Sequence, residues 1–218
     1  MIRRAISLTL PLLMAALSGC NALYAGLIMG MHDTPPHTPA RLAADVARYQ
    51  VPAGQVAVLD TSYLRFVRHQ ARYARTYEAA KNHGQLLQLL YFDDAGQLVS
   101  FHINCYASPQ LPSLNLNWNP GGRLNTFPPA SQTPPDQLLS FAQLLTFLRT
   151  PAGQPLAPAQ FTVPPGGYRV VVFWSHTMGR QTRILLRELA QNLQHVPPGQ
   201  PAPMVLYVNN DAYLGLLD

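Results

Sequence analysis

The chain has 218 residues, of which 48% are hydrophobic and 11% are charged. This composition predicts one folded domain with its own core and excludes a disordered chain. The formal net charge of +5 includes Arg3 and Arg4, so the rest of the chain carries a mild excess of +3. Such an excess lacks the electrostatic footprint of nucleic-acid binding, and nucleic acid is excluded as a partner.

The N-terminal segment has the parts of an export signal. Arg3 and Arg4 form a basic end, residues 5–17 are apolar, and the segment closes with Leu17-Ser18-Gly19-Cys20. This motif resembles the signal of bacterial lipoproteins. The resemblance implies that the signal is cut before Cys20 and that Cys20 carries lipid, which anchors the protein to a membrane of the bacterial cell envelope.

An uncleaved signal anchor is the alternative for the same segment. Apolar residues resume after Cys20, so residues 5–31 are long enough to span a bilayer, which takes about 20 apolar residues. Both alternatives leave the rest of the chain outside the cytoplasm, because the N-terminal arginines stay inside. Asn21, in place of an aspartate, favours the outer membrane over the inner one by the same resemblance, with the protein facing the periplasm.

Prolines separate the signal from the first expected helix. Residues 20–39 are expected to form a tether, since Pro35, Pro36 and Pro39 oppose helix formation. A helix is then expected over Pro39–Tyr49, with Thr38 as its N-cap and proline at its first position.

A second helix is expected over residues 61–82, with an arginine stripe on one face. The 3-4-3 spacing of the arginines places them together: Arg65, Arg68, Arg72 and Arg75. Tyr73 and Tyr77 fall on the opposite, apolar side. One interpretation of the stripe is contact with anionic lipid or an acidic partner, and the other is a solvated helix face.

A β-hairpin is predicted over residues 86–106, with turn-forming residues at 93–96. Alternation along its second strand places Cys105 on the same face as Phe101 and Ile103, toward the core. With Cys20 lipidated, Cys105 has no intramolecular disulfide partner. We expect a small buried hydrophobic side chain at this position, and the alternative is a reactive thiol.

The rest of the chain contains one long loop and alternating elements. Residues 107–136 predict a loop pinned by large apolar side chains (Trp118, Leu124 and Phe127), and such loops often bind ligands. A helix is expected over 136–148. The remaining elements are a buried strand over 168–174, a helix from about 178 to 195 and a strand over 204–208, which together imply a βαβ crossover.

Between Val171 and Gln181, an apolar strand ends in Phe173-Trp174 and a helix follows. This segment resembles the active-site segment of the thioredoxin superfamily, and the resemblance extends over about residues 136–210. Met178 and Gln181 stand where that superfamily has two cysteines. Disulfide exchange needs a thiolate, so the resemblance implies a fold without that activity. The superfamily's C-terminal hairpin is missing, and the hairpin over 86–106 would supply its strands in a permuted arrangement. The alternative is a different α/β sandwich in which this segment is a coincidence.

The turn after the buried strand is also a candidate anion-binding site, because amides at a helix N-terminus attract anions. Its candidate residues are Ser175, His176, Thr177, Met178, Arg180 and Arg183. The alternative is N-capping by Ser175 or Thr177. We find no motif for catalysis, a metal or a cofactor, and we expect none of these sites.

These features predict an α/β protein, with α+β as the alternative: a thioredoxin-like three-layer sandwich with an N-terminal helical extension. The expected parts are a signal (1–19), a tether (20–39), a helical region (40–85) and the thioredoxin-like domain (86–218). The leading hypothesis is a membrane-anchored, periplasm-facing binding or scaffold module for an envelope protein or a small anionic ligand. The alternatives are a single-thiol redox enzyme using Cys105 and a structural protein that contacts anionic lipid through the arginine stripe.

Overall fold

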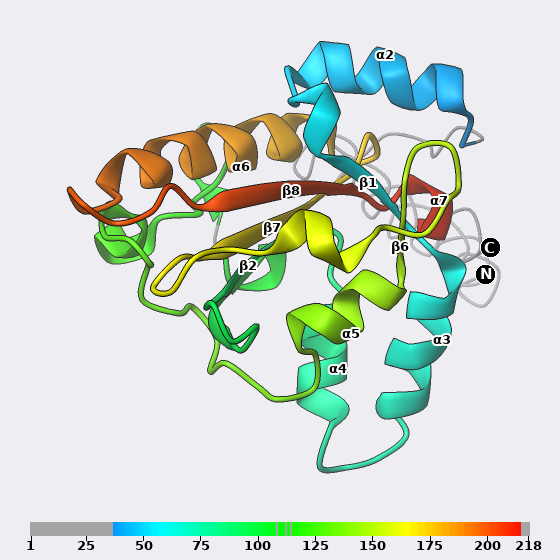
Figure 1. Cartoon of the computed structure of the whole chain (residues 1–218), viewed down its shortest axis with the longest axis horizontal. Helices are drawn as coiled ribbons and strands as arrows, with labels where there is room; N and C mark the ends of the chain where they lie inside the picture. Colours follow the sequence, from blue (N-terminus) through cyan, green and yellow to red (C-terminus); the bar gives the residue numbers. More distant parts are fainter. Residues whose placement is uncertain (1–36, 108, 112, 114, 215–218) are drawn as a thin grey trace, which may run out of the picture.

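A computed structural model describes residues 37–107, 109–111, 113 and 115–214. They form three layers, with a mixed six-stranded sheet between two layers of helices (Figure 1). The expected α/β class is therefore confirmed. The predicted signal, Cys20 and nearly all of the tether lie outside the described residues. Within the described part of the chain, no helix is both long enough and apolar enough to cross a membrane.

Three parallel strands form the centre of the sheet: β7 (Arg169–Trp174), β8 (Met204–Asn209) and β1 (Val56–Leu59). The antiparallel hairpin of β2 (Gln88–Phe92) and β3 (Leu98–Ile103) joins the sheet beside β7. At the other edge, the short strand β6 (Leu148–Arg149) pairs with β1. The order across the sheet is β3-β2-β7-β8-β1-β6.

Helices cover both faces of this sheet. One face carries α6 (Gly179–Asn192) and α2 (Pro39–Tyr49), and the other carries α3 (Thr61–Gln70), α4 (Tyr77–His83) and α5 (Phe141–Thr146) (Figure 1). The other elements are short: the strands β4 (Pro109–Gln110) and β5 (Asn115–Leu116), the helix α7 (Asp211–Leu214), and 3-10 helices at Ala53–Gln55, Asn104–Tyr106, Pro120–Asn125, Pro158–Phe161 and Leu193–His195.

The central strand β7 shows why its sequence is continuously apolar. Val170 and Val172 pack in the cluster that contains α6, whereas Val171 and Phe173 pack in the cluster on the other face. All four side chains are fully buried. A strand covered on both faces cannot alternate between apolar and polar residues, and this strand was predicted from that property.

The first predicted helix is confirmed with its cap, whereas the second is wrong in extent. Thr38 accepts a hydrogen bond from the amide of Arg41, and Pro39 begins α2. The single helix expected over 61–82 instead ends at Gln70 and restarts at Tyr77. The hydroxyl of Thr76 donates to the carbonyl of Gln70 (2.6 Å), which closes a turn between the two helices.

The break changes where the arginine stripe lies. Arg65 and Arg68 are on α3, but Arg72 and Arg75 belong to the α3–α4 connection. All four arginines are exposed. Tyr73 and Tyr77, expected on the apolar side, are 46% and 49% exposed beside them. The stripe is therefore the rim of a protruding end rather than one face of a helix.

Three further expectations need correction. The helix expected from Asp136 begins only at Phe141, because the Asp136 carboxylate instead accepts hydrogen bonds from the amide of Leu138 (2.9 Å) and from His83 (3.1 Å). Strand β1 was missed, since its four residues are too few to show a period. Cys105 is exposed rather than buried, because the strand ends at Ile103 and a 3-10 turn redirects the side chain. The loop expected over residues 107–136 is confirmed. The large apolar side chains that pin it, Trp118, Leu124 and Phe127, are buried.

The end of α2 generates a prediction about stability. Gln50 follows α2 with φ 56° and ψ 36°, and no other non-glycine residue of the described ranges has a positive φ. A left-handed backbone costs a side-chain-bearing residue roughly 1–2 kcal/mol, which glycine avoids. Gln50→Gly should raise the free energy of unfolding by about 0.5–1 kcal/mol in chemical denaturation. Gln55→Gly, at an exposed position without a positive φ, is the control, and an equal gain there would contradict the explanation.

Candidate functional site

The carboxyl ends of the parallel strands bring polar residues together. The loop after β7 contributes Ser175 and His176, and the end of β8 contributes Asn209 and Asp211. The Asp211 carboxylate accepts hydrogen bonds from the Ser175 hydroxyl (2.5 Å), the His176 amide (3.0 Å) and the Asn209 side-chain amide (2.7 Å). All of these groups are buried. The strand ends are thus tied to each other through one carboxylate.

The ring of His176 extends this network to α2. Its Nδ1 lies 2.9 Å from the Asp45 carboxylate, and its Nε2 lies 2.7 Å from the guanidinium of Arg41. Arg41 also donates to Asp45 (3.2 Å). Because a guanidinium can only donate, Nε2 must accept and Nδ1 must carry the proton given to Asp45. The ring contacts two residues of α2 at once and so clamps this helix onto the end of the sheet.

The structure does not bring the six predicted anion-site residues into one open site. Ser175, His176, Thr177 and Met178 are between 0% and 6% exposed, and the first two are engaged in the network above. The helix begins after Met178, with no side-chain hydrogen bond at its N-cap, so neither Ser175 nor Thr177 caps it. Arg180 is half-buried and Arg183 is exposed. Arg183 lines a cavity at the protein surface.

That cavity is a groove of about 540 Å³ between α2 and α6, which we call the arginine groove. Its lining residues are Arg48, Tyr49, Gln50, Val51, Pro52, Arg183, Leu186, Arg187, Ala190 and Tyr207. Three of these side chains are arginines, and none is a carboxylate. Arg187 lies 3.6 Å from the neighbouring Glu188, and the guanidinium of Arg48 lies 5.7 Å from the centre of the Tyr49 ring. The groove is cationic with an apolar wall.

The tyrosines of the groove report its electrostatics. Burial is the main cause that raises the pKa of Tyr49; Arg48 and Arg183 oppose that rise, and the carboxylates of Asp45 and Asp211 add to it. Arg48 on α2 and Arg183 on α6 therefore both act on the Tyr49 hydroxyl. Burial also raises the pKa of Tyr207, so both hydroxyls are neutral at pH 7. The Tyr49 hydroxyl is buried in the groove wall without a hydrogen-bond partner among the described residues.

In the described part of the chain, the other nucleophilic and metal-ligating side chains do not form a catalytic or metal site with the His176 network. The Ser175 hydroxyl donates to Asp211 while the His176 ring faces Asp45 and Arg41, so the two are not a nucleophile and base pair. Cys105 lies elsewhere, with its thiol donating to the side chain of Gln85 (2.8 Å). The described residues contain no group of three or more His, Cys, Asp and Glu side chains that could hold a metal ion.

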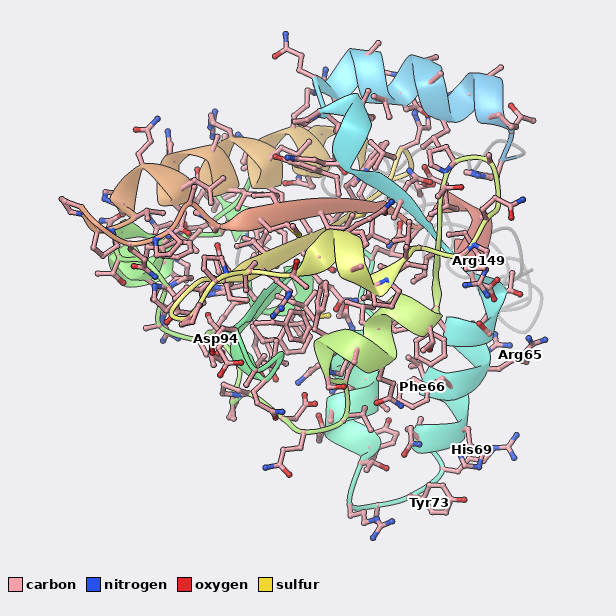
Figure 2. The ribbon with its side chains drawn as sticks, in the orientation of Figure 1. Arg65, Phe66, His69, Tyr73, Asp94 and Arg149 are labelled. Atoms are coloured by element: carbon pink, nitrogen blue, oxygen red, sulfur yellow. The ribbon has the colours of Figure 1, made fainter. Side chains whose placement is uncertain are left out.

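The arginine stripe lies across the sheet from the arginine groove. The groove is formed by α2 and α6, while the stripe is at the free end of α3 and the connection to α4 (Figure 1). Figure 2 shows Arg65, His69 and Tyr73 projecting outward at this end. The sequence showed the stripe through its spacing. It could not show the groove, because the three groove arginines come from two helices far apart in the chain.

No family model, no curated protein and no solved structure matches the chain. The site is therefore interpreted from its own geometry.

The contacts of His176 with Asp45 and Arg41 predict that Asp45→Ala destabilises the protein and loosens α2. The substitution leaves the buried Nδ1–H of His176 without its acceptor, whereas the Arg41 side chain is 41% exposed and can turn to water. A buried donor without an acceptor costs about 1–3 kcal/mol, so the free energy of unfolding should fall by about the same amount. Amides of α2 should also exchange faster with solvent, measured by hydrogen–deuterium exchange.

A matched control removes an exposed ion pair instead. Glu78→Ala breaks the contact with Lys81 (3.4 Å), in which both side chains are more than half exposed. Such pairs contribute about 0–1 kcal/mol. If Asp45→Ala costs no more than Glu78→Ala, the network does not hold α2 in place.

Proposed function

We propose that this chain is a bacterial lipoprotein whose folded part is a binding module rather than an enzyme. The motif Leu17-Ser18-Gly19-Cys20 behind an apolar segment supports cleavage before Cys20, acylation of Cys20 and a position facing the periplasm, and Asn21 favours the outer membrane. The described fold would then sit in the periplasm, held at the membrane by lipid. Its binding surface would be the arginine groove.

We further propose that the domain is a permuted thioredoxin-like domain without redox activity. Strand β7 ends in Phe173-Trp174, α6 follows, and β8 returns parallel to β7. The hairpin of β2 and β3 lies beside β7, where the permuted arrangement requires it. At the two cysteine positions, Met178 is buried, and the Gln181 side chain accepts a hydrogen bond from the amide of Leu116 (3.0 Å). Both positions serve packing in this chain.

One observation carries the choice of ligand: three arginines from two helices line a groove without a carboxylate. Arginine binds carboxylates through paired, charge-assisted hydrogen bonds. Leu186, Ala190 and Val51 add apolar surface between the charges. An acidic segment of an envelope protein, with an apolar side chain between its carboxylates, would complement this surface.

The proposal predicts a specific cross-link in living cells. A photoreactive amino acid at Ala190, an exposed position in the groove, should give one dominant envelope-protein adduct. Arg48→Ala with Arg183→Ala should reduce the yield at least tenfold, since each lost charged hydrogen bond is worth about 1.5–3 kcal/mol. Adducts are resolved by electrophoresis and identified by mass spectrometry.

Two controls make the result decisive. Arg65→Ala with Arg68→Ala removes the same charge from the other side of the molecule and should leave the yield unchanged. The same photoreactive group at Gln194 should not give the adduct. Gln194 is exposed in the 3-10 helix that follows α6 and is not part of the groove lining. An adduct that survives loss of Arg48 and Arg183 would contradict the proposed site. A folded, exported protein without any protein adduct would point to a small anion in its place.

A second candidate function is contact with an anionic membrane surface, and the exposed tyrosines favour it. Between Thr61 and Tyr77 the chain has four arginines and no carboxylate. Tyr73 and Tyr77 are exposed at the same end. Tyrosine and arginine together are typical of membrane–water interfaces, where basic side chains attract anionic headgroups.

This candidate is tested with vesicles and protein lacking residues 1–20. Each arginine near an anionic surface contributes about 1 kcal/mol, so Arg72→Ala with Arg75→Ala should weaken binding to phosphatidylglycerol vesicles roughly tenfold or more in a sedimentation assay. Binding should also fall as salt rises. Arg48→Ala with Arg183→Ala is the control of equal charge. Binding that ignores salt, or that both double variants weaken equally, would remove this candidate.

A further inference from the structure

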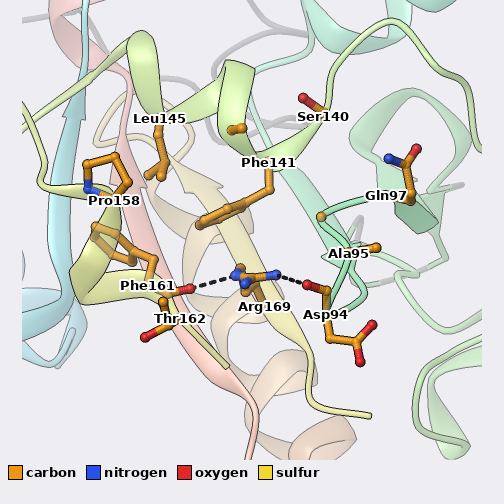
Figure 3. A pocket seen from close by; sticks show the side chains of 12 residues that line it. Asp94, Ala95, Gln97, Ser140, Phe141, Leu145, Pro158, Phe161, Thr162 and Arg169 are labelled. Carbon is orange, nitrogen blue, oxygen red and sulfur yellow. Dashed lines mark hydrogen bonds between the residues drawn. The ribbon is translucent and has the colours of Figure 1, made fainter. Parts of the chain in front are cut away.

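A second cavity lies on the opposite face of the sheet from the arginine groove. It has a volume of about 350 Å³ and opens beside the first residue of β7 (Figure 3). The turn between β2 and β3 forms one side, α5 forms a second, and the 3-10 helix at Pro158–Phe161 forms a third. Nothing in the proposed function uses this cavity.

One charged side chain, Arg169, dominates its chemistry. Its Nε donates to the carbonyl of Phe161 (2.6 Å), and its Nη1 donates to the carbonyls of Asp93 (2.7 Å) and Asp94 (3.4 Å). One face of the guanidinium lies 5.0 Å from the centre of the Phe141 ring. These contacts fix the orientation of the group.

The contacts do not neutralise the charge. All three acceptors are neutral carbonyls, and none of the ion pairs found in the described ranges includes Arg169. The nearest carboxylate in the lining, that of Asp94, accepts from the amide of Gly166 (2.7 Å), and Figure 3 shows it pointing away from the guanidinium. The Nη2 edge has no hydrogen-bond acceptor in the described protein.

The walls around this cation are mostly apolar. Phe141 and Phe161 pack edge to face with ring centres 6.0 Å apart, and Leu145 and Pro158 continue the apolar lining. A cation held in a fixed orientation beside apolar walls is a group that can orient an anionic ligand through charge-assisted hydrogen bonds. Small-molecule sites combine such walls with a few fixed polar groups, in volumes of about 300–1,000 Å³.

We propose that this cavity binds a small amphipathic acid, with its carboxylate on the Nη2 edge of Arg169 and its apolar part along the wall that Phe141 and Phe161 form together. A single guanidinium matches a single negative charge. The Asp94 carboxylate at the rim disfavours a doubly charged phosphate, because like charges repel. The site is separate from the arginine groove, so it goes beyond the proposed binding of an envelope partner.

The test uses octanoate as the probe and octanamide as its uncharged match. Each is added to the protein cleaved before Cys20. Chemical shifts of the Ala95, Gly96 and Phe141 amides should move saturably with octanoate in two-dimensional NMR spectra. Octanamide should bind at least tenfold more weakly, and Arg169→Gln should weaken octanoate to the same degree. Equal binding of the two probes would overturn the proposal.

Arg169 also holds two loops, so a second variant separates binding from folding. Ala142 is exposed at the rim of the cavity, and Ala142→Trp should fill the space without touching the arginine contacts. This variant should keep the thermal midpoint of the parent protein and lose the octanoate shifts. Unchanged shifts in Ala142→Trp, or no saturable shifts in the parent protein, would overturn the site. Cross-linking at Ala190 should be unaffected, which keeps this result independent of the arginine groove.

Discussion

The buried carboxylate of Asp211 is the interaction on which the organisation of this molecule depends. It receives hydrogen bonds from the loop after β7 and from the end of β8, so it joins the two central strands where their backbones separate. A buried carboxylate is tolerated only when donors surround it. Here the donors include the His176 amide, and this fixes the direction in which the His176 ring leaves the loop.

The direction of that ring then determines where α2 lies. The ring contacts both Asp45 and Arg41, so α2 is fixed beside α6. Trp174 and Tyr49 pack edge to face beneath the same contact, with ring centres 5.7 Å apart. The arginine groove exists because of this placement, since Arg48 comes from α2 and Arg183 from α6. A buried polar network thus positions an exposed cationic surface that it does not itself form.

Sequence periodicity predicted the parts of the fold that local forces decide. The capped helix at Pro39, the hairpin and the central strand have caps, turns or apolar runs that can be seen within a few residues. The break between Gln70 and Tyr77 was missed because it depends on a hydrogen bond from Thr76 that competes with helix continuation. The groove was missed for a different reason. It depends on pairs such as Asp45 and His176, which are 131 positions apart, and no local pattern contains them.

The proposed lipid anchor at Cys20 would have to accommodate both cationic surfaces. Residues 21–36 of the tether would span at most about 50–60 Å when extended, at roughly 3.3–3.6 Å per residue. The described chain begins just before α2, on the side of the sheet that holds the groove (Figure 1). Membrane contact through the α3–α4 end would therefore turn the groove away from the lipid, where the proposed partner would have access. The two proposed contacts are compatible on these grounds, because they lie across the sheet from each other and draw on different arginines.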